Sequence, residues 1–227
     1  GHRRGGVAMA AVGACAGFGA ICGSSLATAA TMGRVALPEL RRMGYSGSLS
    51  TGALAAGGTL GILIPPSVIL IIYSILTEQN IAKMFLAAFV PGILAAIGYL
   101  IAIAIFVRIK PDSGPPTSYV GWRQRLSLFG QVWQILVIFF LVIGGIYLGW
   151  FTPTEGASIG AAGTGIMALF TKGFNFNDLI EVIKDTAVTS AMIFLVLLGA
   201  EFFNSFIALT QITNQLATFV ITNQLSP

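Results

Sequence analysis

Long stretches without any charged residue limit the fold of this chain more than any other feature. They are residues 5–33, 51–77, 84–107, 131–150 and 156–171. A helix needs about 20 apolar residues to cross the roughly 30 Å hydrocarbon core of a bilayer. Only 9% of the 227 residues are charged, against about a quarter in ordinary soluble domains. The sequence therefore predicts an all-α, polytopic membrane protein and argues against a soluble enzyme, a nucleic-acid-binding module or a disordered chain.

Residues that carry chemistry are sparse. Cys15 and Cys22 offer neither a disulfide framework nor zinc-ligand spacing and are interpreted as small core residues. His2 is the only histidine, and no Ser/His, paired Asp or His/Glu metal constellation is present. The sequence predicts that the chain is not an enzyme and has no cofactor.

The apolar segments are either uninterrupted or interrupted by residues that disfavour a spanning helix. Residues 84–107 and 131–150 have the length and composition of simple spans. Residues 156–171 are short and rich in glycine, which favours burial among other helices. Residues 179–209 are expected to form one long helix with an amphipathic start.

The other two apolar segments are interrupted. The middle of 5–33 reads Cys22-Gly23-Ser24-Ser25, where a spanning helix would favour leucine and isoleucine. Residues 51–77 contain Pro65-Pro66. Proline cannot donate a backbone hydrogen bond, and its ring disfavours helical geometry in the preceding residue. A proline-broken transmembrane helix is therefore predicted there.

The basic residues favour a re-entrant helical hairpin over a crossing for residues 5–33. A crossing would separate its flanking arginines, because Arg3 and Arg4 would lie opposite Arg34, Arg41 and Arg42. Basic residues tend to share the cytoplasmic side. If the segment turns back at Gly23-Ser24-Ser25, every one of the 12 basic residues except Lys83 faces the cytoplasm.

Irregular backbone at membrane depth is tolerated only where protein buries it or where it lines a wet cavity. Ser24 and Ser25 offer hydroxyls, and the backbone around Gly61, Ile64 and Pro66 offers carbonyls for a hard cation such as sodium. Half-helix N-termini would favour an anion. The alternative is structural: the prolines only kink a packed helix, and the small residues only permit close helix contacts.

Three motifs, in order, resemble the large membrane subunit of tripartite ATP-independent periplasmic (TRAP) transporters. They are residues 23–30 (GSSLATAA), residues 57–67 (GGTLGILIPPS) and residues 151–156 (FTPTEG). The linker from Pro38 to Met43-Gly44-Tyr45 also fits. The likeness extends from the first residue to the last, and it implies that this chain is about half of such a subunit.

The resemblance implies a sodium-driven elevator transporter of the bacterial inner membrane. Its substrates would be organic acid anions, such as C4-dicarboxylates or sialic acid, delivered by a soluble periplasmic binding protein. A small membrane subunit, separate or fused, would accompany it. Sodium would be the coupling ion, and membrane lipid but no nucleic acid would be a partner.

The resemblance also implies which residues bind. By position, the first sodium site would lie between the hairpin tip and the broken helix and would use Cys22, Ser24, Gly61, Ile64 and Pro66. Substrate contacts are placed at Gly23, Ser25, Thr28 and Pro65. Family members often have serine where this chain has Cys22, so the ligand at that position is expected to be the backbone carbonyl.

Three regions are expected along the chain. Residues 1–83 would form half of a transport domain, with the hairpin at 5–33 and the broken helix at 51–77. Residues 84–150 would be scaffold and connecting helices, with a cytoplasmic amphipathic segment at 111–130. Residues 151–227 would begin a second repeat, so that only one half of an inverted repeat is visible.

Some alternatives stay open. A single-component ion-coupled carboxylate carrier and a non-transporting membrane scaffold are the competing functions. Glu155 is interpreted as part of a helix cap rather than a gate. Glu201 is either an intramembrane functional carboxylate or a residue at a helix end near the far interface. Trp122, Trp133 and Trp150 are expected to form an interfacial belt.

Overall fold

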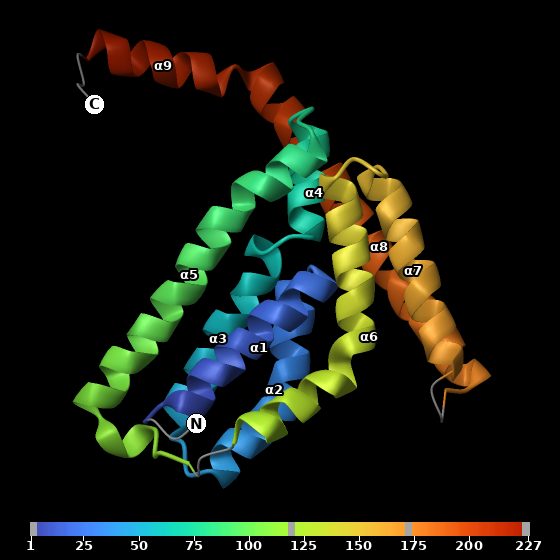
Figure 1. The fold of residues 1–227 in the computed structure, drawn as a ribbon. Helices are drawn as coiled ribbons and strands as arrows, with labels where there is room; N and C mark the ends of the chain where they lie inside the picture. The colour runs from blue at the N-terminus through green and yellow to red at the C-terminus, as the bar shows by residue number, and fades with distance from the viewer. Residues whose placement is uncertain (1–3, 118–120, 171–173, 224–227) are drawn as a thin grey trace. The chain divides into compact units, whose positions relative to one another are not determined.

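The computed structural model describes residues 4–117, 121–170 and 174–223, and their regular structure is entirely helical (Figure 1). The side chains of residues 122–129, 131, 132, 216 and 220 lie outside the described set. The chain forms two compact units, Gly1–Gly165 and Ile166–Pro227, which we describe separately. The helices are α1 (Gly6–Cys22), α2 (Ser25–Arg42), α3 (Gly47–Leu63), α4 (Val68–Leu76), α5 (Ile81–Ile109), the short 3-10 helix η1 (Pro111–Ser113), α6 (Trp122–Tyr147), α7 (Pro153–Phe170), α8 (Phe176–Thr210) and α9 (Ile212–Thr222).

Helices α1 and α2 form the helical hairpin expected from the sequence. They run side by side in opposite directions and are joined by Gly23 and Ser24 (Figure 1). Gly23 has φ +63°, a left-handed conformation that glycine adopts without steric cost. The second arm continues to Arg42, past the end of the charge-free stretch. Re-entry of this hairpin into a membrane stays a prediction.

The proline-broken helix is confirmed as a break. Helix α3 ends at Leu63, α4 begins at Val68, and the two axes differ by 42°. Because Pro65 and Pro66 have no N–H, neither can donate to a carbonyl of the preceding turn. The helix ends where these donors are missing.

Two described helices, α5 and α8, are long and apolar enough to cross a membrane, and the α3–α4 pair is a third if it forms one bent span. Helix α5 covers the span expected at 84–107, and α8 covers the long helix expected at 179–209. The span expected at 131–150 is helical, but its described apolar part, Trp133–Tyr147, is shorter than a full crossing requires. The structure therefore supports a membrane protein with two or three candidate spans.

The amphipathic segment expected at 111–130 does not form a separate helix among the described residues. It contains the short helix η1 and the beginning of α6, whose backbone continues without interruption to Tyr147. The side chains that would make this part amphipathic, at residues 122–129, lie outside the described set.

The core of the first unit depends on residues too small to separate the helices. A Cβ added to Gly19 of α1 would lie 2.5 Å from the Gly61 Cα of α3, and one added to Gly58 would lie 2.8 Å from the Ala29 Cβ of α2. Helix α5 adds Ile103 and Val107 to the same buried cluster. Small residues let backbones approach closely, which drives helix association in lipid.

One end of the first unit is closed by backbone pairing between distant segments. The Gly5 N–H donates to the Gly114 carbonyl at 2.9 Å, and the Ser46 N–H donates to the Ser113 carbonyl at 2.9 Å. The Val7 N–H donates to the Tyr45 hydroxyl at 3.1 Å. We call Gly5, Val7, Tyr45, Ser46, Ser113 and Gly114 the closed end. These bonds join the start of α1, the start of α3 and the segment after α5.

The second unit contains α8 and α9 and buries none of the described α8 residues. Asn175 and Asp178 form a reciprocal capping box at the start of α8. Glu201 is exposed and lies more than two turns before the end of α8. The expectation of a carboxylate at the helix end therefore does not hold in this structure.

Candidate functional site

The hairpin tip and the helix break lie against each other. The Val68 N–H donates to the Gly23 carbonyl at 3.3 Å. A Cβ at Gly23 would lie 2.9 Å from the Pro66 carbonyl oxygen and 3.4 Å from the Ser67 Cα. We call residues 22–25 and 61–68 the break end. The two interruptions that the sequence places far apart are therefore in direct contact.

Local chemistry explains how the tip turns. The Gly23 N–H donates to the Gly19 carbonyl at 2.7 Å and closes α1. The Ser24 side chain then accepts from the Ala27 N–H at 3.3 Å and caps α2. A left-handed glycine followed by an N-cap serine is a common way to end one helix and begin the next.

The break leaves carbonyls without donors. The Ile64 N–H donates to the Leu60 carbonyl at 2.9 Å, and this is the last backbone bond of α3. In the part of the chain that the structure describes, the carbonyls of residues 61–66 accept no hydrogen bond. Unpaired backbone oxygens are rare in buried positions because they lose their hydration without compensation. They are available to a cation.

The electrostatics of the four helix ends are of two kinds. Helices α1 and α3 end here, so their carbonyl ends bring partial negative charge. Helices α2 and α4 begin here, so their N–H ends bring partial positive charge. Cation and anion sites can therefore lie next to each other at the break end.

Thr28 connects the two sides of the tip. Its side chain is completely buried. Its hydroxyl donates to the Ser24 carbonyl at 2.7 Å and lies 3.1 Å from the Cys22 Sγ. The Thr28 N–H donates to the same Ser24 carbonyl at 3.0 Å. Thr28 therefore lies behind the tip rather than on its surface.

The structure brings the sequence-predicted site residues together. The five residues proposed for sodium and the four proposed for substrate all lie at the break end, except Thr28, which lies directly beneath it: Cys22, Ser24, Gly61, Ile64 and Pro66 for sodium, and Gly23, Ser25, Thr28 and Pro65 for substrate. Gly61, Gly23 and Pro65 are buried, whereas Ser24 and Ser25 are half-buried. Their ligand roles stay a prediction.

Sequence reasoning missed the part played by Gly19. Because neither Gly19 nor Gly61 has a side chain, the backbones of α1 and α3 come into close contact directly beneath the break. The glycines in 57–61 signalled close packing, but nothing in the sequence identified their partners. The close helix contacts that the structural alternative expected are present, and ion binding at the break stays a prediction.

No group of three or more His, Cys, Asp or Glu side chains that could hold a metal ion occurs among the described residues. A cation at the break end would therefore be held by neutral oxygens. Such oxygens suit a hard monovalent ion, because they supply no net charge.

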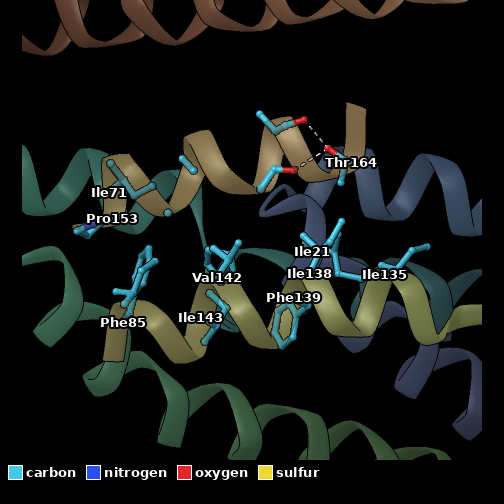
Figure 2. Close-up of a pocket in the computed structure, with 16 residues that line it drawn as sticks. Ile21, Ile71, Phe85, Ile135, Ile138, Phe139, Val142, Ile143, Pro153 and Thr164 are labelled. Atoms are coloured by element: carbon cyan, nitrogen blue, oxygen red, sulfur yellow. Dashed lines mark hydrogen bonds between the residues drawn. The ribbon is translucent and has the colours of Figure 1, made fainter. Parts of the chain in front are cut away.

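A cavity of about 330 Å³ lies beside the break, between Pro66 and the facing helices α6 and α7 (Figure 2). Its labelled lining is apolar apart from Thr164, whose hydroxyl donates to the Gly160 and Ala161 carbonyls within its own helix. The walls offer no charge to an anion. This cavity is therefore not the candidate polar site.

Glu155 has a structural role. Its carboxylate accepts from the Thr152 N–H at 2.7 Å and from the Thr152 hydroxyl at 2.9 Å, and its own N–H donates back to the Thr152 Oγ1 at 3.3 Å. The backbone hydrogen bond, followed by the hydroxyl, lowers the pKa of the Glu155 carboxyl. The interpretation of Glu155 as a helix cap is confirmed.

Interrupted helices that meet at their breaks are a device of secondary transporters. Together with the two or three candidate spans, they are typical of a helical membrane protein with interrupted helices. All residues, 1–227, match the family model for the tripartite ATP-independent periplasmic transporter, DctM component. The chain belongs to this family, and the resemblance of the three motifs is confirmed.

Curated relatives share the whole length of the chain. The C4-dicarboxylate TRAP transporter large permease protein DctM of Pseudomonas aeruginosa is 35% identical over 228 residues, which are 100% of this chain and 53% of that protein. The sialic acid TRAP transporter permease protein SiaT of Haemophilus influenzae is 34% identical over 233 residues, with coverage of 100% and 37%. The ectoine TRAP transporter large permease protein TeaC of Halomonas elongata is 29% identical over 229 residues, with coverage of 100% and 53%.

The chain spans about half the length of the DctM and TeaC relatives. All three relatives are named as permease proteins of transporters. The expectation that the chain is not an enzyme is therefore confirmed by its family.

Proposed function

We propose that this chain is part of the large permease subunit of a sodium-coupled TRAP transporter that imports organic acid anions. The observation that carries this proposal is the contact between the two breaks, where the Val68 N–H meets the Gly23 carbonyl. Two carbonyl ends and two N–H ends of helices meet there. Coupled transport of a cation and an anion needs both kinds of site close together.

Sodium would bind to oxygens of the break. The carbonyls of residues 61–66 accept no hydrogen bond from the described chain, and the adjoining end of α1 adds the Cys22 carbonyl. The Cys22 thiol points to the Thr28 hydroxyl instead. Since sodium prefers oxygen to sulfur, its contact at residue 22 would be with the backbone.

The anion would bind next to the sodium ion. The N-terminal N–H groups of α2 and α4 offer hydrogen bonds, and the bound cation adds positive charge. Ser25, Gly23 and Pro65 are the proposed neighbours of its carboxylate. Sodium would therefore raise the affinity for substrate through charge, and substrate would raise the affinity for sodium equally.

The proposed substrate class and partners come from the family. Relatives are named for C4-dicarboxylates and for sialic acid, which are organic acids. A periplasmic binding protein would deliver the substrate, and a small permease subunit, separate or fused, would complete the complex. The location would be the bacterial inner membrane, where the exposed apolar side chains of α5 would face lipid.

An elevator movement is proposed for the first region of the chain. Residues 1–83 would carry the break end past a scaffold that includes residues 84–150, and residues 151–227 would begin the second repeat. Helix α5 contacts both α1 and α3, and the Thr59 hydroxyl lies 2.9 Å from the Tyr99 hydroxyl of α5. If α5 stays with the scaffold, these contacts must exchange during transport.

Uptake by the full-length protein with its small subunit in proteoliposomes tests the proposal. We expect accumulation of radiolabelled succinate or sialic acid only with an inward sodium gradient and a loaded binding protein. Gly23→Ala, which would contact the Pro66 carbonyl, should abolish uptake, whereas Gly33→Ala should not because its position is open. Uptake that is indifferent to both sodium and the binding protein would contradict the proposal.

The same experiment separates the competing functions. A single-component carrier would show sodium-dependent uptake without a binding protein. A non-transporting scaffold would show no uptake, and Gly23→Ala would change only the amount of assembled protein.

A further inference from the structure

Thr28 makes more contacts than its helical position requires. Serine and threonine often return a hydrogen bond to the carbonyl four residues earlier, as Thr28 does to Ser24 at 2.7 Å. Here the acceptor is the N-cap residue of α2, which also accepts the Thr28 N–H at 3.0 Å. One residue therefore supplies two donors to the Ser24 carbonyl. Both lone pairs of that oxygen are occupied.

The Thr28 hydroxyl also contacts Cys22, the last residue of α1. The Thr28 hydroxyl gives its proton to Ser24, and its oxygen lies 3.1 Å from the Cys22 Sγ. That sulfur also lies 3.6 Å from the Ser24 carbonyl oxygen and 3.9 Å from the Gly19 carbonyl oxygen. Cys22 is the last residue of α1, and Ser24 precedes the first residue of α2. The path from Cys22 through Thr28 to Ser24 therefore fixes both arms of the hairpin at the turn.

Thr28 also touches the broken helix. A Cβ added to Gly61 would lie 2.8 Å from the Thr28 Oγ1 and 3.0 Å from the Ser24 carbonyl oxygen. Gly61 is the first residue whose carbonyl lost its helical donor. The hydroxyl therefore rests against the backbone where the unpaired carbonyls begin.

We propose that Thr28 is a positioning residue for the sodium site, an inference that rests on the proposed function. Its hydroxyl turns the Ser24 carbonyl into α2, so that this oxygen is not an ion ligand, and it sets the distance between the tip and Gly61. The ion then takes its carbonyls from the break and from the end of α1. Ser24 contributes through its side chain.

A matched arrangement elsewhere in the chain provides the control. Ser50 is completely buried, its hydroxyl donates to the carbonyl of the N-cap Ser46 at 2.9 Å, and its N–H donates to the same oxygen at 3.0 Å. The local pattern is that of Thr28 and Ser24. Ser46 belongs to the closed end and lies at the opposite end of α3 from the break. Ser50→Ala therefore removes the same local bond without touching the break end.

The experiment compares Thr28→Val, Thr28→Ser and Ser50→Ala in the full-length transporter with its partner proteins. We expect Thr28→Val to raise the sodium concentration for half-maximal uptake about fivefold, as for the loss of one hydrogen bond, with the maximal rate retained at saturating sodium. Thr28→Ser should restore the normal sodium dependence because it keeps the hydroxyl. Ser50→Ala should leave the sodium dependence unchanged.

The outcomes separate this inference from the proposed function. If the unmodified transporter does not respond to sodium, both fail. If it responds but Thr28→Val has the same sodium dependence, or if Ser50→Ala shifts it equally, only the positioning role fails. Thr28→Ala serves as a second hydroxyl-free variant if Thr28→Val does not accumulate. If neither accumulates while Thr28→Ser does, the hydroxyl is purely structural and the inference is overturned.

Discussion

The two ends of the first unit differ in how their backbone N–H and carbonyl groups outside the helices are hydrogen-bonded. At the closed end, segments from three parts of the chain pair their backbone groups, as Gly5 does with Gly114 and Ser46 with Ser113. At the break end, one backbone bond joins Gly23 and Val68, and the carbonyls of residues 61–66 are left without donors in the described chain. Irregular backbone is stable at both ends because each is packed against helices. At the break end, the unpaired carbonyls lie where two helices begin and two helices end, and this combination is the one proposed to bind ligands.

The comparison also shows that a local motif does not decide function. Ser24 with Thr28 and Ser46 with Ser50 have the same capping and back-bonding pattern. What differs is the surroundings: one pair lies against the break at Pro65-Pro66, and the other lies beside the backbone bond from the Ser46 N–H to the Ser113 carbonyl. Function at the break end therefore depends on what the cap faces.

The largest expected effect comes from separating the helices below the break. Gly19→Val would place side-chain atoms inside the contact with the Gly61 backbone, which cannot move away as a side chain could. We expect a loss of about 3 kcal/mol in the free energy of unfolding, as for overpacked cores, and no uptake. Gly17→Val is the control, since nothing lies within 4 Å of its added Cβ. Unfolding in detergent measures both, and equal stability of the two variants would contradict the packing argument.

The next largest effect is expected from a substitution that gives the carbonyls of the break end hydrogen-bond donors. Replacing Pro65 and Pro66 by alanine restores two N–H donors, which can pair with the Gly61 and Ile62 carbonyls. We expect sodium-dependent uptake to fall at least about tenfold, as when a metal's ligand shell is disturbed, with no loss of thermal stability.

Pro38→Ala provides the matched control for this change. Pro38 lies inside α2, near the end of that helix opposite the hairpin tip, and is exposed. Its replacement should leave sodium dependence unaltered in the same uptake assay. Normal sodium dependence in the Pro65 and Pro66 variant would show that the unpaired carbonyls are not the ion site.

A smaller effect separates capping from ion binding. Ser24→Ala and Ser46→Ala each remove an N-cap hydrogen bond, to the Ala27 and Leu49 N–H groups respectively. Each should cost about 1 kcal/mol of stability. Only Ser24→Ala should also raise the sodium concentration for half-maximal uptake. Thermal melts and sodium titrations of both variants test this, and a shared shift in sodium dependence would remove the functional difference between the two ends.

The smallest effect concerns a cap remote from both ends. The pKa of Glu155 is lowered from 4.5 by its hydrogen bonds with Thr152, so its stabilising contribution is present above pH 4.5 and is lost as the pH falls through the lowered pKa. We expect a small drop in melting temperature over that range, which Glu155→Gln should abolish. A variant with the same acid dependence as the unmodified protein would assign the drop to other carboxylates.

Sequence patterns predicted much of the helical organisation. The tip at Gly23, the break at Pro65-Pro66 and the long helices at 81–109 and 176–210 all follow from local chemistry and from runs of apolar residues. The predicted helix boundaries were less accurate where the end of a charge-free stretch was used as the end of a helix. Helix α2 runs through Arg34 to Arg42 because charged residues end an apolar stretch without ending a helix, and Glu39 and Arg42 pair along its surface.

The candidate site was predictable in composition but not in geometry. The motifs include nearly all residues of the break end. They did not point to Gly19, which packs beneath it, or to the complete burial of Thr28. The local sequence around Thr28 does not reveal its burial, because the cover comes from α1 and α3. A contact between distant segments leaves no signal in a single sequence.

The sequence by itself determined where this chain is apolar, where its helices must open and which family it belongs to, because missing N–H donors, glycine φ angles and charge-free runs are local properties. Only the tertiary structure decided that the two openings meet, that Gly19 presses on Gly61, and that the Thr28 hydroxyl joins Cys22 to Ser24. These contacts depend on how closely α1, α2 and α3 approach one another. That distance is set jointly by small residues that lie far apart in the sequence.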